Sequence, residues 1–414
     1  MKQYVVILTL LISIFYFSAA QAVEIINVGI ISLHKKQKLA YDGVIERFER
    51  ANPNVKVRLR KLTGAGYQEL FQSLVAAHHD IDVLIWHGSK RLEELVNKGY
   101  IQTIDDVWQE AKLENIFDSA ITKSVKFSGK HYGIPLFYYP WGFFYKKSLF
   151  KQFELSPPSN WKEFITLLAK LKSNQLSPIA IGTKEAWPAA AWFEYFTLRL
   201  HGYEFYQKVL QGKVSFNSAK LAQVFTYWQQ LINQDYFFDG HKDISSHKSL
   251  HLIAREMSGV MLTGSFALSY LDDDNHIEFG YFPFPKLGSK HNHDEIAPTS
   301  AVALTTVTHH SVVAKRFIRY LSQAENQEVL SAALSSMSPN KRVTYKGALT
   351  ALDAQHIISR AKHLSQFFDR ETPAEFSLEA QRAFVEFIEH GDISRVQSNL
   401  EKHRQKHFVD ALAD

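Results

Sequence analysis

The sequence GIPLFYYPWGFFYKKSLF, residues 133–150, places seven aromatic side chains around Pro140 between Phe137 and Tyr145. Successive side chains of a strand point to opposite faces, so Phe143 and Phe144 fit the two faces of a core strand. The residues from Tyr138 to Gly142 do not fit a regular strand, because Pro140 interrupts them. Their rings either belong to a core or line a wet cleft, and the pattern alone leaves both readings open.

The first residues carry the features of an export signal. Lys2 is followed by an apolar run over residues 4–17 and then by Ala20-Gln21-Ala22, which is typical of a cleaved signal peptide at residues 1–22. The run is shorter than the roughly 20 apolar residues that span a bilayer, and no later stretch approaches that length. We expect a mature protein that begins near Val23 and is exported to the periplasm; an uncleaved anchor is the alternative.

The composition limits the classes of function. The 414-residue chain has no cysteine, which excludes disulfides, thiol catalysis, thiolate metal sites and a lipid-modified N-terminal cysteine. Its formal charge of +5 is modest and interspersed, so short basic clusters are expected to be solvated faces and nucleic acid is not an expected partner. The length is sufficient for two domains, each with its own core.

The order of elements in the first hundred residues indicates an α/β sheet. An apolar strand over residues 24–30, a loop at His34 to Lys36, a helix ending at Asn52-Pro53 and an alternating strand from Val55 lead to the buried strand DIDVLIW, residues 80–86. Ligands of open α/β sheets bind at the carboxyl ends of strands. Trp86 and His87 end such a strand; Trp86 either faces a ligand or packs under the next helix.

Later segments continue the alternation. Asn160 and Glu163 have capping-box spacing and predict a helix start, and a second helix begins near Pro188. The helical stripe that contains Trp228 is expected to be core. The strand SGVMLTG runs into Ser265 and Phe266, a second candidate cleft edge, and SAVALTT is one more strand before a mostly helical C-terminal part.

Taken in order, these segments resemble the sugar-binding family of extracellular solute-binding proteins of ATP-binding-cassette importers, which includes the maltodextrin-binding proteins. The similarity covers nearly the whole mature chain. Seven loose motifs carry it by their order and spacing: GVIERFERANPNVKV, DIDVLIWHGSKRLEELVNKGYIQTI, GKHYGIPLFYYPWGFFYKKSLF, PPSNWKEFITLLAKL, REMSGVMLTGSFAL, FGYFPFPKLG and SVVAKRFIRYLSQAENQEVL.

The resemblance implies an α/β fold of two lobes, the type II periplasmic binding protein, in which each lobe is a mixed sheet flanked by helices and the ligand lies between the lobes. Residues 23–137 with about 290–322 would form the N-terminal lobe, and residues 138–289 with about 323–414 the C-terminal lobe. The chain would cross near Pro135 to Pro140, near Tyr281 to Gly288 and after Tyr320. Such lobes close on a ligand by hinge motion.

The resemblance also implies a carbohydrate ligand, and it answers the question of the rings. Sugars present apolar C–H faces beside hydroxyls, so aromatic side chains with a polar edge suit them. We expect Trp141 and either Tyr138 or Tyr139, at the first crossing, to contact the ligand. Of Trp187 and Trp192, at the helix near Pro188, only one is expected to do so, because side chains five positions apart on a helix point in different directions. The candidate ligand-binding residues are Trp86, His87, Tyr138, Tyr139, Trp141, Trp187, Trp192, Ser265, Phe266, Thr299 and Ser300.

One departure from the maltodextrin-binding pattern concerns charge. Those relatives carry a carboxylate a few residues after the Trp86 strand, whereas this chain has His87, Lys90 and Arg91, and its early loop holds Lys35 and Lys36. A carboxylate accepts hydrogen bonds from sugar hydroxyls, so its loss puts a neutral maltodextrin ligand in question. Two readings stay open: a basic cleft for a sugar acid, a sulfated sugar or a phosphorylated sugar, or cations that point into solvent.

The remaining expectations concern partners and chemistry. The partner is a membrane permease of an ATP-binding-cassette importer, or alternatively a membrane sensor, and the protein is expected to be a monomer. We expect no cofactor and no metal: the HNHDE segment, His291 to Glu295, reads as an exposed loop, and the aromatic surroundings of the tyrosine pair suit a sugar better than ferric iron. No motif of a common catalytic class is present, so an enzyme is not expected.

Overall fold

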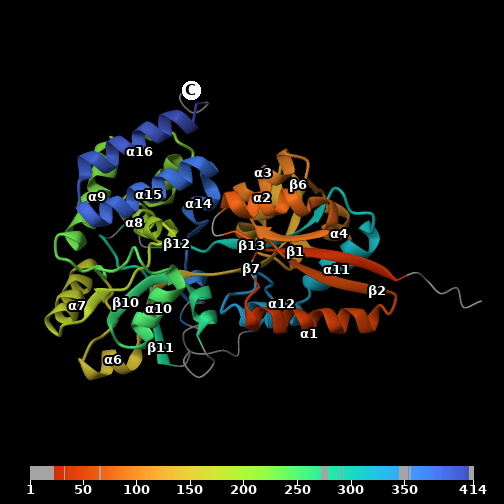
Figure 1. The fold of residues 1–414 in the computed structure, drawn as a ribbon, viewed down its shortest axis with the longest axis horizontal. Helices are drawn as coiled ribbons and strands as arrows, with labels where there is room; N and C mark the ends of the chain where they lie inside the picture. Colours follow the sequence, from red (N-terminus) through yellow and green to blue (C-terminus); the bar gives the residue numbers. More distant parts are fainter. Residues whose placement is uncertain are drawn as a thin grey trace, which may run out of the picture.

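The computed structural model describes residues 23–31, 33–64, 67–271, 278–288, 290–291, 293–344, 353 and 356–409, so the expected signal peptide and the Asp272-Asp273-Asp274 turn lie outside the described residues. Two lobes lie side by side, each built around its own sheet (Figure 1). The α/β two-lobed fold class expected from the sequence is confirmed by this architecture.

The first lobe contains a six-stranded mixed sheet. β1 (Glu24–Ile30) pairs in parallel with β2 (Val55–Lys61) and β3 (Val83–His87), and β13 (Thr299–Thr305) pairs antiparallel with β3, β4 (Ile101–Gln102) and β7 (Gly133–Tyr138). β3 and β13 are apolar and buried on both faces, as expected for central strands. A late segment, β13, therefore completes the sheet that the N-terminal residues begin.

Helices cover both faces of this sheet. They are α1 (Lys35–Ala51), α2 (Tyr67–Ala77), α3 (Lys90–Asn97), α4 (Asp105–Glu110), α11 (Ser311–Leu321) and α12 (Ala324–Ala333), with a short α5 (Ser119–Thr122) and 3-10 turns η1 (His78–Asp80), η2 (Leu113–Asn115) and η3 (Lys123–Val125). The prediction of a loop over His34 to Lys36 is wrong for the two lysines, which form the first turn of α1. His34 is the N-cap, and its backbone N–H donates to Gln37 Oε1 at 3.4 Å.

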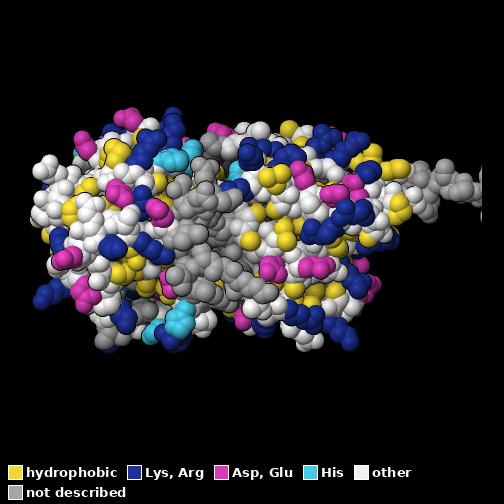
Figure 2. Space-filling model, turned by 90° about the horizontal axis from the view of Figure 1, so that it is seen from below, with side chains coloured by type: hydrophobic (Ala, Val, Ile, Leu, Met, Phe, Trp, Pro, Cys, Tyr) yellow, Lys and Arg dark blue, Asp and Glu magenta, His cyan; other side chains and the backbone are white. Residues whose placement is uncertain are grey.

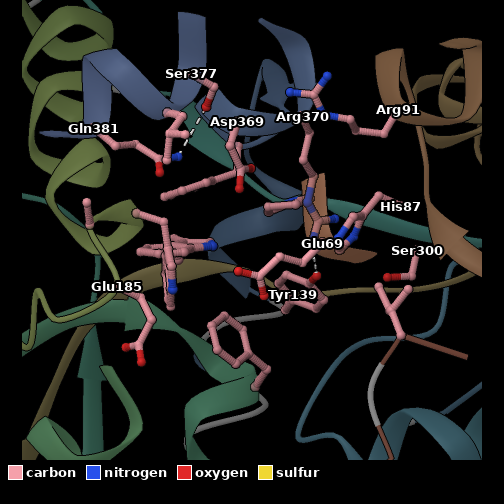
Figure 3. A pocket seen from close by; sticks show the side chains of 18 of the residues that line it. Glu69, His87, Arg91, Tyr139, Glu185, Ser300, Asp369, Arg370, Ser377 and Gln381 are labelled. Carbon is pink, nitrogen blue, oxygen red and sulfur yellow. Dashed lines mark hydrogen bonds between the residues drawn. The ribbon is translucent and has the colours of Figure 1, made fainter. Parts of the chain in front are cut away.

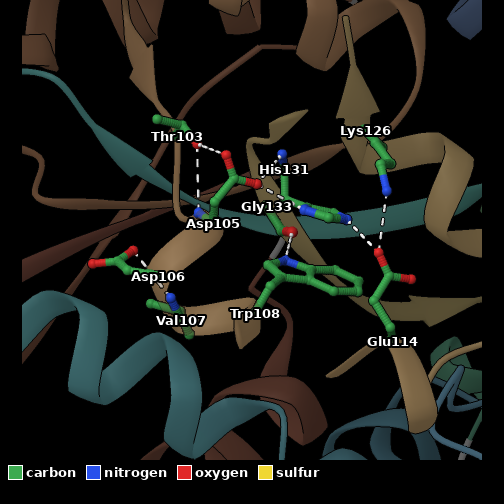
Figure 4. A network of polar contacts seen from close by, with 9 residues as sticks. All are labelled: Thr103, Asp105, Asp106, Val107, Trp108, Glu114, Lys126, His131 and Gly133. Carbon is green, nitrogen blue, oxygen red and sulfur yellow. Dashed lines mark hydrogen bonds and ion pairs between the residues drawn. The ribbon is translucent and has the colours of Figure 1, made fainter. Parts of the chain in front are cut away.

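A charged network holds a small hairpin against the first lobe (Figure 4). The hairpin consists of β5 (Lys126–Phe127) and β6 (Lys130–His131). The His131 ring stacks on Trp108 at 4.1 Å, its Nδ1 lies 2.8 Å from Asp105 Oδ1, and its Nε2 lies 3.0 Å from Glu114 Oε1. Lys126 Nζ lies 3.1 Å from the same Glu114 oxygen. These contacts tie the hairpin to α4 and η2 of the first lobe.

The second lobe contains a four-stranded sheet in the order β11, β8, β10, β9. β8 (Trp141–Lys146) is antiparallel to β10 (Ser258–Gly264) and β11 (Phe279–Phe282), and β9 (Ser177–Ile179) is parallel to β10. β7 belongs to the first sheet and β8 to the second, so the chain passes between the lobes at Tyr139-Pro140.

Most of the second lobe is helical. Its helices are α6 (Lys147–Gln152), α7 (Trp161–Ser173), α8 (Ala190–Leu210), α9 (Ala219–Ile232), α10 (Ser246–Ala254), α14 (Phe368–Glu371), α15 (Ala374–His390) and α16 (Ile393–His407), with 3-10 turns η4 (Trp187–Ala189) and η5 (Ser265–Tyr270). The predicted cap of α7 is confirmed, since Asn160 Oδ1 accepts from Glu163 N at 3.1 Å. Trp228 is fully buried against Phe384 and Phe387, as its helical stripe predicts.

Two lobe assignments from the sequence differ from the packing in the structure. Residues near Tyr281 to Gly288 were expected to cross between the lobes, but β11 lies within the second sheet and the chain joins the first sheet only at Thr299. Residues from 323 were expected in the second lobe, whereas Leu330 and Leu334 belong to the core around the first sheet. Gln327 Nε2 also donates to Pro135 O at 3.0 Å. Helical periodicity alone does not reveal which sheet a helix covers.

The prediction of an exposed loop at HNHDE is wrong for its last residues. Asp294–Ile296 forms β12, which pairs with β14 (His363–Ser365), and Asp294 and Glu295 are buried. Glu295 Oε1 forms a buried ion pair with Arg199 Nη2 at 2.6 Å, and Asp294 Oδ1 lies 2.7 Å from His363 Nδ1. The charged residues look like loop sequence because their partners lie 69 and 96 positions away along the chain.

The surface carries mixed charge. Figure 2 shows lysine and arginine side chains interspersed with acidic ones on the face it displays. Within the described part of the chain, no helix has both the length and the apolar character needed to cross a membrane.

Candidate functional site

A cavity of about 1020 Å³ lies between the two lobes. The first lobe contributes the start of α1 and the ends of β1 and β3, and the second contributes η4, η5 and α15. The crossing segment at Tyr139 and the residues around α14 complete it. Strand ends and helix starts thus surround the space, as expected for a ligand site in α/β sheets.

Aromatic side chains form one wall of this cavity. Trp141 stacks on Phe367 at 4.5 Å between ring centroids, and Trp187 stands perpendicular to Trp141 at 5.9 Å. Phe266 lies 6.1 Å from Trp187 and 5.1 Å from Tyr139. Trp141 is only 2% exposed, while Trp187 and Phe266 are half-buried. The accessible ring surface therefore comes from Trp187 and Phe266, with Trp141 behind them.

Close backbone packing fixes Trp141 in place. The hydroxyls of Tyr195 and Tyr281 each lie 2.7 Å from the Trp141 carbonyl oxygen. The Tyr281 ring crosses Gly142, where an added Cβ would meet the ring at 2.6 Å. Only glycine leaves room for that approach. The Trp141 indole Nε1 is buried and has no hydrogen-bond partner among the described residues.

Asp369 supplies a carboxylate to the same cavity. Figure 3 shows it beside the aromatic wall, and its Oδ1 has no hydrogen-bond partner among the residues that the structure describes. Burial raises the pKa of Asp369, and the charges of Arg370 and Arg91 only partly offset this. A buried acceptor without a partner is costly, which makes the Asp369 carboxylate a candidate acceptor for a hydrogen bond from a ligand in this cavity.

The basic residues near the cavity are engaged in structural contacts. Arg91 is buried and donates to Glu94 at 2.7 Å and to the Thr372 carbonyl at 2.8 Å. Arg370 donates to the Thr299 carbonyl at 3.1 Å and to the Tyr139 hydroxyl. Burial, together with the charges of Arg370 and Arg91, lowers the pKa of His87 well below its usual value, so His87 is neutral at pH 7.

Direct contacts join the lobes at the other side of the cavity. Ser269 Oγ lies 3.1 Å from His34 Nε2, the rings of His34 and Tyr270 are 5.3 Å apart, and Lys36 Nζ donates to Leu271 O at 2.5 Å. His34 and Lys36 belong to the first lobe and η5 to the second. The lobes are therefore in contact across the cleft in this conformation.

Helix α15 extends the cavity beyond the aromatic wall. The residues that line it recur at spacings of three and four: Ala374, Ser377, Leu378, Gln381, Arg382, Val385 and Glu386. With a rise of 1.5 Å per residue, this face is about 18 Å long. Gln381 Nε2 donates to Ser377 Oγ at 3.1 Å, as Figure 3 shows. The cavity is thus longer than a site for a single small ring needs to be.

The structure divides the predicted site residues into two sets. Six of them line the cavity: His87, Tyr139, Trp141, Trp187, Phe266 and Ser300. The other five are buried outside its lining: Trp86, Tyr138, Trp192, Ser265 and Thr299. Whether any of them contacts a ligand remains a prediction.

The five outside the lining have structural surroundings. Trp86 lies in the core of the first lobe, and Trp192 packs on Phe143 and Phe237 in the second, five positions from the cavity-lining Trp187. Tyr138 exchanges backbone hydrogen bonds with Met337, and the Thr299 carbonyl accepts from Arg370. Ser265 N donates to Pro140 O at 3.0 Å. Side-chain alternation along β13 explains why Thr299 turns away from the cavity that its neighbour Ser300 lines.

The sequence reasoning missed the segment FFDRET, residues 367–372. Phe367, Asp369 and Arg370 line the cavity, yet they come more than two hundred residues after the aromatic stretch that they contact. The available signal was two aromatics followed by three charged residues, a pattern that is unusual for a surface turn. Through Asp369, this segment also supplies a carboxylate to the cavity, whereas the strand that ends at Trp86 is not followed by the carboxylate that maltodextrin-binding relatives carry there.

Within the described residues, no group of three or more histidine, aspartate or glutamate side chains is arranged to hold a metal ion. The residues around the cavity instead combine ring faces, one unpartnered carboxylate oxygen and neutral polar groups. Their geometry fits a polyhydroxylated organic molecule.

Comparison with known proteins places the chain in a family. The family model for the bacterial extracellular solute-binding protein matches residues 33–328. An uncharacterised extracellular-binding protein of an ABC transporter from Pyrococcus horikoshii is 24% identical over 314 residues, which are 74% of this chain and 69% of that protein. The multiple sugar-binding protein of Streptococcus mutans is 24% identical over 297 residues, 70% of this chain and 69% of that protein.

Solved structures agree in fold. The bacterial solute receptor AcbH, whose described preference is for β-D-galactopyranose, superposes with a TM-score of 0.85 at 23% identity over 94% of this chain and all of that one. A binding protein in complex with raffinose gives a TM-score of 0.79 at 16% identity, over 92% of this chain and all of that one. Members of this family bind solutes and are not enzymes, as expected from the sequence. The chain belongs to the bacterial extracellular solute-binding protein family of ABC transporters.

Proposed function

We propose that this protein captures a neutral oligosaccharide between its lobes and delivers it to the permease of an ATP-binding-cassette importer. One observation carries the carbohydrate assignment: the aromatic wall of Trp187, Phe266 and Trp141 stands beside the unpartnered carboxylate oxygen of Asp369. Ring faces pack on the C–H faces of a sugar, and a carboxylate accepts its hydroxyl hydrogens.

The charge of the cavity favours a neutral ligand over a sugar acid. Acidic and basic side chains balance in its lining: Glu69, Glu185, Asp369 and Glu386 against Arg91, Lys184, Arg370 and Arg382. The two buried arginines already donate to protein carbonyls, and the pKa of His87 is lowered, so these groups offer little positive charge to an anion. A ligand carboxylate would also face Asp369, and like charges repel in a water-poor cavity.

The length of the cavity favours more than one sugar ring. The lining residues of α15 span about 18 Å along the helix, from Ala374 to Glu386. Among them, Ser377 and Gln381 can exchange hydrogen bonds with hydroxyls. The aromatic wall would hold one ring and α15 the rest of the chain.

The place of capture and the partner follow from the family and the N-terminal residues. β1 begins at Glu24, directly after the expected cleavage site, so removal of residues 1–22 would leave the sheet intact. We propose a periplasmic monomer, since described residues of one chain surround the cavity. Ligand contacts to both lobes would stabilise the closed form, which the permease then recognises.

The test is a thermal-shift screen of residues 23–414. The panel contains neutral sugars (galactose, maltotriose, xylotriose, raffinose and stachyose), uronic acids (galacturonate and trigalacturonate) and divalent metal ions. A ligand at 100 times its Kd adds about 2.7 kcal/mol of stability, which is visible as a higher Tm. We expect a neutral oligosaccharide to raise the Tm most. A shift with uronic acids alone would refute the neutral assignment, and a shift with metal ions alone would refute a carbohydrate.

A further inference from the structure

The segment Phe367–Thr372, which we call the junction segment, contacts both lobes through nearly every residue. Phe367 stacks on Trp141, and Phe368 N donates to the buried Glu194 carboxylate at 2.7 Å, both in the second lobe. The Thr372 carbonyl accepts from Arg91 of the first lobe. Glu371 accepts a hydrogen bond from Ser89, also in the first lobe. The segment is six residues long, so these contacts leave it little freedom of its own.

Arg370 at its centre connects the places where the chain passes between the lobes. Its Nη1 donates at 3.1 Å to the carbonyl of Thr299, the first residue of β13 after the second crossing. Its Nη2 donates to the hydroxyl of Tyr139, which lies on the first crossing, and the guanidinium lies 5.3 Å from the centre of the Tyr139 ring. Arg370 itself belongs to the junction segment, which contacts both lobes.

The chemistry of this contact requires arginine. The guanidinium is a planar fork whose two ends donate in different directions while its face packs on a ring. Arg370 is only 7% exposed, so its hydrogen bonds form where water competes weakly. A lysine would keep the charge but could not span both acceptors from one rigid group.

The neighbouring side chain faces the ligand site. Asp369 lines the cavity, and Figure 3 shows it and Arg370 on the same segment, with Arg370 beside Tyr139. A ligand that binds Asp369 therefore acts on the residue adjacent to the one that joins the crossings. Ligand binding at Asp369 is therefore linked to the geometry of the hinge through the peptide bond between Asp369 and Arg370.

We propose that Arg370 is a positioning residue that ties the crossing segments at Tyr139 and Thr299 to the junction segment and so sets the angle between the lobes. It acts on the ligand through Tyr139 and through the orientation of the junction segment, not by contact with the sugar. The ligand-dependent part of this inference rests on the proposed capture function, whereas the effect on the free protein does not.

The test measures the distance between the lobes. Because the chain has no cysteine, Leu39→Cys and Met257→Cys provide two exposed labelling sites, one in each lobe, for single-molecule energy transfer. Arg370→Lys is compared with Arg382→Lys, which alters another cavity-lining arginine. Arg382 pairs with Glu379 on the same helix at 3.7 Å. Tyr139→Phe removes one of the two bonds and leaves the ring.

We expect Arg370→Lys, without any sugar, to broaden or shift the distance distribution while circular dichroism shows an intact fold, and Arg382→Lys to match the wild type. Tyr139→Phe should give a smaller change in the same direction. The double variant should change no further than Arg370→Lys, because both substitutions remove the hydrogen bond between Arg370 and the Tyr139 hydroxyl. An unchanged distribution in Arg370→Lys and Tyr139→Phe would overturn the proposal. If Arg370→Lys does not fold, Tyr139→Phe decides alone.

Titration with raffinose and maltotriose separates this inference from the proposed function. For any sugar that closes the wild type, we expect Arg370→Lys to bind about tenfold more weakly and Arg382→Lys to lose less. A wild type that responds to no sugar in the screen refutes the proposed carbohydrate, while the measurement on the free protein still decides the role of Arg370.

Discussion

Replacement of Asp369 by asparagine should change stability and binding in opposite directions. The pKa of Asp369 is raised from its ordinary value of 3.8 because burial disfavours the ionised form. A raised carboxyl pKa means that the ionised group opposes folding at neutral pH, and that this cost disappears below pH 3.8. Asp369→Asn keeps the shape and removes the charge, so we expect a higher Tm at pH 7 and no difference near pH 3.5.

Binding of a neutral sugar should fall in the same variant. A hydrogen bond to a charged group contributes about 1.5–3 kcal/mol and a neutral one about 0.5–1.5 kcal/mol, so the loss is roughly 1–1.5 kcal/mol, or about tenfold in Kd. Isothermal titration calorimetry with the neutral sugar that gives the largest thermal shift measures it. Binding should also weaken as the pH falls through the raised pKa, since the carboxylate then becomes protonated.

Glu386→Gln is the matched control. Glu386 also lines the cavity, but its carboxylate already pairs with Arg395 at 3.2 Å, so we expect little change in Kd. A folded Asp369→Asn variant that binds as tightly as the wild type would refute the reasoning. Equal losses in the two variants would show that overall cavity charge, and not the Asp369 oxygen, determines affinity.

Four further variants test other parts of the account. Trp187→Ala should weaken sugar binding with a small change in Tm. Trp192→Ala empties a core position and should cost about 3–5 kcal/mol of stability. Similar stability losses in both variants would contradict the assignment of Trp187 to the cavity wall. Gly142→Ala should lower the Tm and weaken binding, because its Cβ would displace the Tyr281 ring from Trp141; a crystal structure with Tyr281 unmoved would contradict this. For Asp105, desolvation raises the pKa, but hydrogen bonds from His131 and Thr103 lower it overall, below the ordinary 3.8. Its stabilising effect is therefore present above pH 3.8 and lost as the pH falls further, so Asp105→Asn should melt earlier than the wild type at pH 6, with the difference shrinking in acid scans; a difference independent of pH would contradict the mechanism.

The structure also changes what Trp141→Ala is expected to do. From the sequence, Trp141 is expected to contact the ligand, and loss of such a contact alone would weaken binding in an intact fold. Trp141 is 2% exposed and stacked on Phe367, so truncation should also cost about 3–5 kcal/mol of stability. Trp187, whose ring is more accessible, is the better position for a test of stacking.

Local patterns predicted much of the fold and part of the cavity. Strands such as Val83–His87 and the α7 cap at Asn160 depend on neighbouring residues, so the sequence reveals them directly. The cavity residues on the first crossing and on η4 were found because rings clustered there. The junction segment was missed because its role depends on partners far along the chain: Arg370 on Thr299 and Tyr139, and Phe367 on Trp141.

Residue burial explains the remaining differences. Trp86 and Trp192 lie within five positions of residues that line the cavity, and composition does not distinguish a tryptophan in a core from one in a cleft. The basic residues near the cleft were ambiguous for the same reason. Arg91 stabilises the fold because it donates a hydrogen bond to the Thr372 carbonyl. A linear pattern does not reveal that this carbonyl lies beside Arg91.

A crystal structure of residues 23–414 grown with the neutral sugar that gives the largest thermal shift tests the central claim most directly. The account predicts a sugar ring against Trp187 and Phe266, a hydroxyl within hydrogen-bond distance of Asp369, and further rings along α15. A sugar bound elsewhere on the protein, or an empty cavity at saturating sugar, would contradict it.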